Sequence, residues 1–315
     1  MMAKRSKPKI PHYKRKRQRS VVTRIFGWIV KVIIGFVVIS VLWVFAYKYV
    51  NPPITANMLV DIIGGRGATR EWLPITKLDH DMVDAAIAGE DGKFCSHHGF
   101  DFQAIENAMK NNASGGRIRG GSTISQQTAK NVFLWNGGGY VRKGLEAWFT
   151  FLIEHMWGKR RIMEVYLNVA ETGIGTYGVN AGSQRYFGHD ASAMTASEAA
   201  RIAAVLPLPK ERGAIAPKGF TRRYGNIILA REPGITAGGY DSCIYKGYGA
   251  PQKKAPPPVT KAPRPLPGAD YESVKPLPPE PSYTPEPAPA PANEVQPTEE
   301  PPANPVQTEN AFTNT

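Results

Sequence analysis

Cysteine is scarce in this chain of 315 residues, which contains only Cys95 and Cys243. No metal-ligand spacing surrounds either of them, so a metal site built on cysteine is excluded. The two thiols could pair in an oxidising compartment. However, Cys95 lies beside the candidate active loop described below, and Cys243 lies beyond the main domain. We therefore expect two unlinked thiols.

Acidic residues are missing from the first 60 positions, since the first one is Asp61. Residues 1–24 carry ten lysines and arginines, so the formal net charge of +13 lies mostly in an N-terminal arm. A basic arm of this kind can bind nucleic acid. The apolar segment that follows argues against a nucleic-acid partner and favours a cytoplasmic arm next to a membrane.

That segment, residues 25–49, is apolar apart from two lysines, small residues and tyrosines at its far end. About 20 apolar residues span a bilayer as a helix. Lys31 lies near the cytoplasmic end, where its aliphatic chain can extend and place the amine at the membrane surface, and Trp43 suits the opposite interface. The run is too long for the apolar core of a signal peptide, and no convincing cleavage site follows. The sequence predicts a single transmembrane helix, with the N-terminus inside and everything after about Asn51 outside the cytoplasm.

Long alternations of apolar and polar residues are also missing, which argues against a fold dominated by sheet. Residues 50–249 instead contain apolar residues at helical spacing. The three clearest stripes are Phe102, Ile105, Met109; Leu145, Phe149, Leu152, Met156; and Ile162, Val165, Tyr166, Val169. An alanine-rich helix over 198–206 should end at Pro207. We expect a mainly α domain over residues 50–249.

Residues 250–315 have a different composition and hold about two-thirds of the chain's 28 prolines. Such a segment cannot bury enough apolar surface to fold. It is predicted to be a disordered, extended tail that serves as a linker or docking segment.

Glu90 and Asp91 are adjacent acids at the end of an alanine-rich run, within the stretch AAIAGEDGKFCSHHGFD (residues 85–101). Small residues suit close helix packing. Shielding from water then raises a carboxyl pKa and prepares the group for proton transfer. A solvated acid pair at a helix end explains the same residues equally well.

The stretch GGSTISQQTAKNVFL, residues 120–134, contains a capping box that predicts the start of a helix. Free backbone N–H groups in the first turn, side-chain hydroxyls and amides, and the following Lys130 are suited to bind phosphate. The Gly-Lys-Ser/Thr end of a Walker loop is absent, which excludes that class of nucleotide site. A well-capped structural helix is the alternative interpretation.

Glu146 follows Arg142 and Lys143 by about one helical turn, so the three can face one cleft. A carboxylate next to two cations stays ionised and can orient a cation, a metal or a developing positive charge. A second basic cluster, residues 159–161, follows. Taken singly, charges such as these more often lie on a solvated helix face.

Five stretches resemble, in order and spacing, the successive motifs of lysozyme-like peptidoglycan glycosyltransferases, known as glycosyltransferase family 51. They are EDGKFCSHHG, GGSTISQQTAKN, RKGLE, KRRIMEVYLN and AGSQRYF, and the resemblance covers about Ile75 to Pro209. With no penicillin-binding domain after them, the chain is similar to the monofunctional biosynthetic form. That family implies a lysozyme-like domain anchored in the bacterial cytoplasmic (inner) membrane. Its activity is to polymerise lipid II into glycan strands on the outer, periplasmic side.

The resemblance also implies roles for residues. Glu90 matches the glutamate of E-D-x-x-F, a general base for the acceptor sugar's 4-hydroxyl. A β-1,4 bond then forms with inversion, and undecaprenyl diphosphate is released. Glu146 matches the glutamate of R-K-x-x-E, a second carboxylate that assists departure of the pyrophosphate, where a divalent cation (Mg²⁺ or Mn²⁺) is allowed. The residues implied to hold the pyrophosphates are Ser122, Thr123, Gln127, Lys130, Arg142 and Lys143. Asp91, His97 and Gly99 are expected to shape the loop.

Two departures from the family pattern stand out. Gly137 to Gly139 occupy the place where relatives commonly carry an arginine, and Gly158 stands where they tend to have serine. Residues 111–121 are expected to form a mobile loop that admits a long lipid-linked substrate. The expected partners are lipid II, the growing strand and the membrane, and not nucleic acid.

Two other functions stay open. One is a lytic enzyme that cleaves finished glycan. The other is a non-catalytic scaffold whose tail recruits division or elongation proteins.

Overall fold

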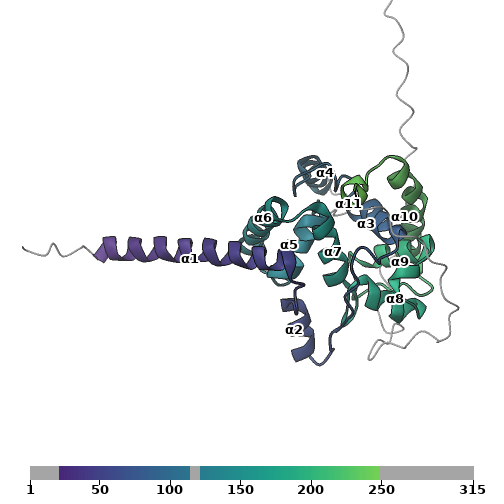
Figure 1. Ribbon diagram of the computed structural model, residues 1–315, viewed down its shortest axis with the longest axis horizontal. Coiled ribbons are helices and arrows are strands. Elements are labelled where there is room, and N and C mark those ends of the chain that lie inside the picture. Colours follow the sequence, from purple (N-terminus) through teal and green to yellow (C-terminus); the bar gives the residue numbers. More distant parts are fainter. Residues whose placement is uncertain (1–20, 114–120, 248–315) are drawn as a thin grey trace, which may run out of the picture. The chain divides into compact units, whose positions relative to one another are not determined.

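The computed structural model describes residues 21–113 and 121–247 (Figure 1). Its helices are α1 (Val21–Tyr49), α2 (Ala56–Ile63), α3 (His80–Glu90), α4 (Phe102–Ala113), α5 (Ile124–Phe133), α6 (Gly139–Met156), α7 (Lys159–Val169), α8 (Val179–Phe187), α9 (Ala196–Val205), α10 (Gly219–Ala237) and α11 (Ser242–Tyr245), with a 3-10 turn at Ala191–Ala193. The strands are β1 (Thr69–Arg70), β2 (Glu171–Gly173) and β3 (Thr176–Tyr177). In this small sheet β3 is central, parallel to β1 and antiparallel to β2. The prediction of a mainly α fold is confirmed.

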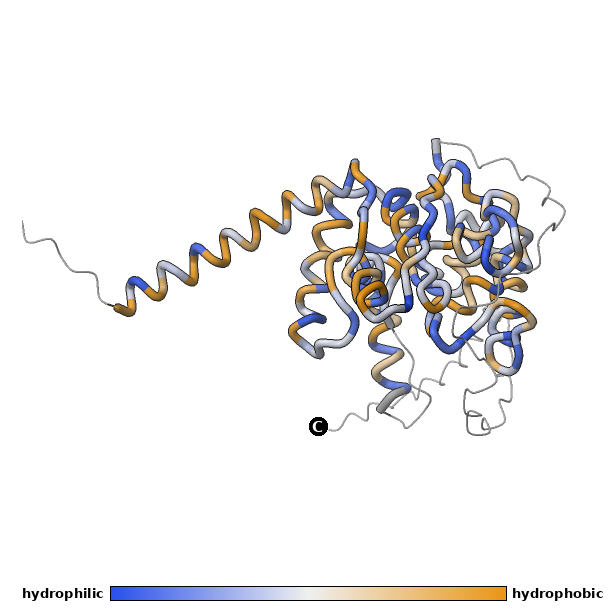
Figure 2. Tube along the Cα trace, turned by 90° about the horizontal axis from the view of Figure 1, so that it is seen from below, coloured by the Kyte–Doolittle hydropathy of each residue, from blue (hydrophilic) through white to orange (hydrophobic). Residues whose placement is uncertain are grey.

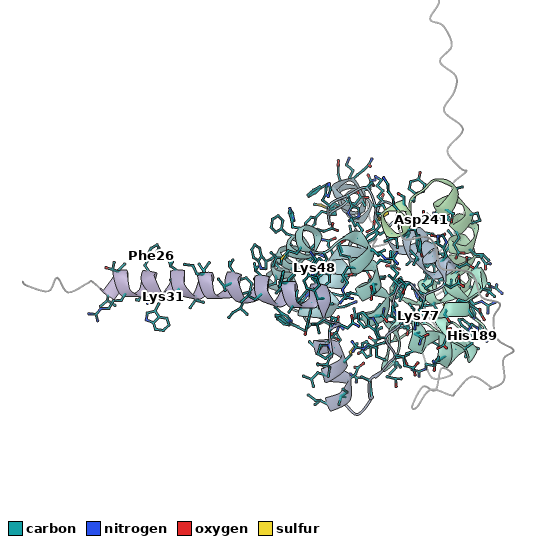
Figure 3. The ribbon with its side chains drawn as sticks, in the orientation of Figure 1. Phe26, Lys31, Lys48, Lys77, His189 and Asp241 are labelled. Carbon is teal, nitrogen blue, oxygen red and sulfur yellow. A yellow bond between two sulfur atoms is a disulfide. The ribbon has the colours of Figure 1, made fainter. Side chains whose placement is uncertain are left out.

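Helix α1 contains the predicted membrane segment and begins four residues earlier, at Val21. Most of its apolar side chains are exposed, and the helix projects from the domain as a largely hydrophobic rod (Figure 2). Phe26 and Lys31 both lie on the projecting part (Figure 3). Within the described ranges it is the one helix long and apolar enough to cross a membrane.

The C-terminal third of α1 packs on the domain. The Trp148 indole N–H donates to the Ser40 hydroxyl at 3.1 Å, and the Trp157 indole N–H donates to the Val44 carbonyl at 2.9 Å. The Arg161 guanidinium donates to the Tyr47 carbonyl. Ser40 and Val44 are buried by this packing. The helix is therefore joined to α6 and α7 by specific contacts as well as by the chain.

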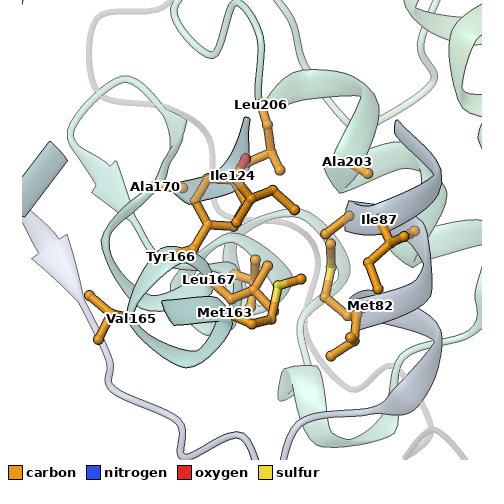
Figure 4. Close-up of a cluster of buried hydrophobic side chains, with 14 of the residues drawn as sticks. Met82, Ile87, Ile124, Met163, Val165, Tyr166, Leu167, Ala170, Ala203 and Leu206 are labelled. Carbon is orange, nitrogen blue, oxygen red and sulfur yellow. The ribbon is translucent and has the colours of Figure 1, made fainter. Parts of the chain in front are cut away.

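The buried core is shared by two sets of packed helices, α3 with α9 and α10, and α5 with α6 and α7. Met82 and Ile87 of α3, Met163 of α7 and Ala203 of α9 belong to one buried cluster (Figure 4). Small residues allow these helices to approach closely: a Cβ on Gly89 would lie 2.9 Å from Cδ1 of Ile228 on α10. The alanine-rich run before the acid pair is therefore a packing surface that brings the end of α3 into the centre of the domain.

Helix α4 forms as expected, but its apolar stripe does not face the core. Phe102 is 75% exposed and Met109 is 67% exposed. The helical spacing of apolar residues predicts the helix. Which element packs against its apolar face depends on the tertiary fold, which the spacing does not determine. The predicted mobile loop lies mostly outside the described residues, as does the predicted tail.

The prediction of two unlinked thiols is wrong, because Cys95 and Cys243 form a disulfide with their Cα atoms 5.4 Å apart. The sequence predicts that Cys243 lies beyond the main domain, whereas α11, which contains it, folds back onto that domain. The Arg160 guanidinium on α7 donates to the Ile244 carbonyl at 2.6 Å, and the Ile244 side chain is fully buried. A separation of 148 residues hides such a contact from any local pattern.

Candidate active site

Glu90 is the last residue of α3. Its Oε2 accepts a hydrogen bond from the Gln127 side-chain amide at 2.8 Å. Its Oε1 is buried and has no hydrogen-bond partner among the described residues. Burial raises the pKa of Glu90, and the hydrogen bond from Gln127 opposes that rise only in part. The side chain therefore offers one unengaged carboxylate oxygen whose affinity for a proton is increased.

The loop after Glu90 is held by Asp91 and His97. His97 Nε2 lies 3.0 Å from both carboxylate oxygens of Asp91, and Asp91 Oδ2 also accepts from the backbone N–H of Ile124 at 3.0 Å. Gly99 has φ +91°, and a Cβ there would lie 2.9 Å from Thr150. These contacts give the three loop residues the structural role that the sequence predicted for them.

The predicted capping box at the start of α5 is present. The Thr123 hydroxyl accepts from the Gln126 N–H, and the Gln126 side chain accepts from the Thr123 N–H. The same hydroxyl donates to the Gly99 carbonyl at 2.7 Å, so the cap also fixes the loop. Ser122 is exposed beside the cap, and Gln127 and Lys130 line a cleft.

Arg142, Lys143 and Glu146 come together on α6 as their spacing predicts. Arg142 Nη1 lies 2.6 Å from Glu146 Oε2, and Lys143 pairs with Oε1 of the same buried carboxylate. Lys143 Nζ also donates to the Ser122 hydroxyl at 3.2 Å, which joins α6 to the start of α5. Both oxygens of Glu146 are thus engaged by cations.

A cleft of about 300 Å³ is lined by Gln127 and Lys130, and neither Glu90 nor Glu146 is among its lining residues. Gln127 in its wall bonds Glu90, and the charge of Lys130 interacts with both Glu146 and Glu90. Burial lowers the pKa of Lys130, while the attraction of Glu146 raises it. The residues that line the cleft are Asn57, Gln127, Lys130, Asn131, Asn136, Tyr166, Val169, Ala170, Glu171, Tyr177 and residues 206–211.

The structure shows the local effect of the two departures from the family pattern, the glycines at 137–139 and Gly158. Gly137, Gly138 and Gly139 all have positive φ, which glycine adopts without strain and arginine does not. Gly158 is the N-cap of α7 and provides no side-chain hydrogen bond to that helix, so the capping bond of a serine is absent.

The second basic cluster has structural roles. Lys159 pairs with Glu154 at 2.7 Å and lies over the Phe94 ring, while Arg160 and Arg161 donate to the backbone of α11 and α1. Its charges support the loop and the two terminal helices.

Sequence reasoning missed three residues around Glu90. The Tyr166 hydroxyl donates to the Gln127 side-chain oxygen at 3.2 Å and so orients the amide that bonds Glu90. The Tyr224 hydroxyl donates to the Gly89 carbonyl, and the charge of Arg212 lowers the pKa of Glu90. Tyr166 belongs to the KRRIMEVYLN stretch, whereas Tyr224 and Arg212 stand in segments with no motif.

Comparison with known proteins decides the family. A family model described as "Transglycosylase" matches residues 56–231, which include every candidate site residue. The chain belongs to the transglycosylase family. Three similar proteins are each named biosynthetic peptidoglycan transglycosylase. The one from Caulobacter vibrioides is 49% identical over 201 residues, 64% of this chain and 88% of its own.

The other two relatives cover similar lengths. The protein from Xanthomonas campestris is 44% identical over 224 residues, covering 69% of this chain and 91% of its own. The protein from Rhodospirillum centenum is 41% identical over 226 residues, covering 71% and 98%. The family membership expected from the five stretches is confirmed.

Glu171 is a further acid in the cleft of this transglycosylase that the sequence analysis did not select. It lies on β2, and its Oε1 is 3.7 Å from Lys210 Nζ, which also pairs with Asp61 at 3.3 Å. Burial raises the pKa of Glu171 to about 7, although Lys210 opposes the rise. The cleft therefore contains a carboxyl that titrates near neutral pH.

Replacing Glu171 with glutamine should change how stability depends on pH. Because the folded pKa lies above the ordinary value of 4.5, the folded state binds more protons, and stability falls as pH rises from about 4.5 to 7. We expect the wild type to lose about 1–2 kcal/mol relative to Glu171→Gln between pH 5 and pH 8, allowing for partial exposure.

Thermal unfolding of both proteins at the two pH values measures this. The exposed Glu106→Gln is the matched control and should follow the wild type. If the wild type and Glu171→Gln show parallel pH dependences, the raised pKa is wrong.

Proposed function

We propose that this transglycosylase polymerises lipid II into β-1,4 glycan strands with inversion and releases undecaprenyl diphosphate. The observation that carries the proposal is that Lys130, in the wall of the cleft, interacts electrostatically both with Glu90, a carboxyl of raised pKa, and with the cations Arg142 and Lys143. A sugar hydroxyl as nucleophile and a diphosphate as leaving group need those two features together.

Glu90 is the general base in this proposal. Its unengaged Oε1 takes the proton of the acceptor's 4-hydroxyl as the oxygen forms a bond to the donor's anomeric carbon. The α-linked diphosphate leaves from the opposite face with the electrons of the broken C–O bond, so the configuration inverts. Gln127, oriented by Tyr166, keeps the other oxygen of Glu90 in place.

The cations stabilise the leaving diphosphate. Arg142 and Lys143, held by Glu146, and the half-buried Lys130 present fixed positive charge where negative charge develops. Ser122 and Gln127 supply hydrogen-bond donors beside them, and the Thr123 cap sets the position of α5. Glu146 acts by positioning these cations.

A divalent cation at the diphosphate, which the resemblance allows, would find few protein ligands here. Both Glu146 oxygens are in ion pairs with Arg142 and Lys143. Such an ion would have to take its ligands from the diphosphate itself, and no step of the proposed reaction depends on it.

The proposed location is the bacterial inner membrane, with α1 as a single anchor, the N-terminus in the cytoplasm and the catalytic domain on the periplasmic side. Ten positive charges before residue 25 support that orientation. The disulfide supports an oxidising compartment for the domain. Anchoring keeps the cleft close to its lipid-linked substrates. Cell-wall synthesis or division proteins are proposed partners of the proline-rich tail.

The purified full-length chain in detergent, given lipid II, should produce glycan strands and undecaprenyl diphosphate. We expect a chelator to leave most of the activity intact, because the cationic side chains already neutralise the diphosphate. Absence of polymer from folded protein contradicts the proposal. Cleavage of finished glycan in its place supports the lytic alternative, which has no use for the cationic site.

A further inference from the structure

Helix α11 and the aspartate before it, residues 241–245, form what we call the C-terminal clasp. The family-model match ends at residue 231, before the clasp begins. Yet Ile244 and Tyr245 are buried against the domain, and the Ile244 carbonyl accepts from Arg160 on α7. Asp241 is labelled in Figure 3, near the yellow disulfide. Two specific attachments, one to Cys95 and one to His80, hold this four-residue helix in place.

The first attachment is the disulfide between Cys243 and Cys95. Cys95 lies five residues after Glu90, in the loop that Asp91 and His97 shape. The preceding Phe94 is fully buried, and its N–H donates to the Asp91 carbonyl at 3.0 Å. The disulfide therefore holds the middle of the loop, whereas Asp91 and Gly99 connect its two ends to α5.

The second attachment is His80, at the first turn of α3. His80 Nδ1 lies 3.1 Å from Asp84 Oδ2, and His80 Nε2 lies 2.9 Å from Asp241 Oδ2. Only the imidazolium can donate from both nitrogens, so this geometry requires the protonated ring. The hydrogen bond to Asp84 raises the pKa of His80, while burial lowers it.

Groups from three sides face this histidine. Tyr245 contacts it in a tilted arrangement with ring centroids 4.4 Å apart and the planes at 32°, and Thr236 on α10 donates to Asp84 Oδ2 at 2.6 Å. Asp79 is the N-cap of α3, and Arg160 on α7 bonds the Ile244 carbonyl of the clasp. His80, Asp84 and Asp241 also lie close enough together to hold a metal ion. However, one ion would bind only one ring nitrogen, whereas a proton on each nitrogen satisfies both carboxylates.

We propose that the C-terminal clasp positions the 91–99 loop, and with it Glu90 and the start of α5, through the Cys95–Cys243 disulfide and the His80–Asp241 bridge. The two attachments hold both ends of α3: His80 at its first turn and Cys95 just past its last. A loop held in this way also fixes the start of α5, because Asp91 accepts from the Ile124 N–H and the Thr123 hydroxyl donates to the Gly99 carbonyl. The clasp residues are positioning residues and touch no substrate.

This inference rests on the proposed function, since its main readout is lipid II polymerisation by the full-length chain in detergent. The variants are the double substitution Cys95→Ser with Cys243→Ser, His80→Gln, and the exposed His155→Gln as the histidine control. Wild type treated with dithiothreitol opens the disulfide in a protein that has already folded. The same treatment of the double serine variant controls for any other effect of the reductant.

We expect reduction, the double serine variant and His80→Gln each to lower kcat by about 10-fold to 100-fold with little change in KM, because a small misplacement of a catalytic group has effects of that size. Hydrogen exchange should speed up in residues 91–99. The contribution of His80 to stability should be lost as pH rises through its raised pKa, and His80→Gln should lack that loss. His155→Gln should match the wild type, and dithiothreitol should not change the double serine variant.

Unchanged kcat and unchanged exchange after verified reduction, together with an unchanged kcat in His80→Gln, would overturn the proposal. A lower melting temperature with kcat unchanged at temperatures well below it also overturns it, because that result describes a purely stabilising element. If the wild type makes no glycan, the proposed function fails. In that case, exchange in residues 91–99 still tests the clasp: faster exchange on reduction supports it, and unchanged exchange overturns it.

Discussion

Replacing Glu90 with glutamine should lower kcat for lipid II polymerisation by about 10²-fold to 10⁴-fold, the range for loss of a general base. Glutamine keeps the size of the side chain and can still bond Gln127, but it cannot accept the proton of the acceptor hydroxyl. The buried and unengaged Oε1 is the atom whose basicity is lost. Polymer formed from labelled lipid II over time measures the effect.

The pH profile sharpens this test. Because burial raises the pKa of Glu90, the wild-type rate should decline on the acid side at a pH above the ordinary glutamate value of 4.5. Glu106→Gln, an exposed change on α4, is the matched control and should keep both the rate and the profile. A folded Glu90→Gln protein with wild-type activity would remove Glu90 from the role of base.

Replacing Lys130 with alanine should lower kcat/KM by about 10²-fold to 10³-fold, because a fixed charge at the developing diphosphate is lost. Lys130 is half-buried and its charge interacts with both Glu146 and Glu90, so water cannot replace its charge efficiently. Lys130→Met keeps most of the volume and separates the loss of charge from the formation of a cavity. Rates at several lipid II concentrations measure the change.

The same variant distinguishes polymerisation from glycan cleavage. A lytic enzyme has no diphosphate to stabilise, so cleavage of finished strands would survive the loss of Lys130. Lys110→Ala removes an exposed lysine of α4 and should leave polymerisation unchanged. Equal activity of Lys130→Ala and Lys110→Ala would show that no phosphate site exists at Lys130.

The parts of the site that follow from local sequence could be predicted. The capping box at Thr123 and the pairing of Arg142 with Glu146 join residues three or four positions apart, which are neighbours on any helix. Their contacts can therefore be read from the sequence. The prediction that Asp91 and His97 shape the loop also agrees with their contacts, since both stand within one short stretch.

The parts that depend on distant segments could not be predicted. Glu171 and Lys210 share the cleft although they are far apart in the chain, and neither belongs to a recognisable pattern. Cys243 reaches Cys95 only because α11 folds back against α7. The stripe on α4 shows the converse, since spacing predicts the helix but not what its apolar face meets.

The packing of α1 on the domain limits how the enzyme can stand on a bilayer. The indoles of Trp148 and Trp157 bond Ser40 and Val44 and so hold the C-terminal third of α1 against the domain. With α1 as the proposed membrane anchor, these contacts connect the domain directly to the membrane segment and so bear on how far the cleft lies from the lipid surface. Inserting a few residues after Asn51 would lengthen the chain connection but leave the contacts of Trp148 and Trp157 with α1 intact. Removing those two contacts would let the domain rotate relative to α1.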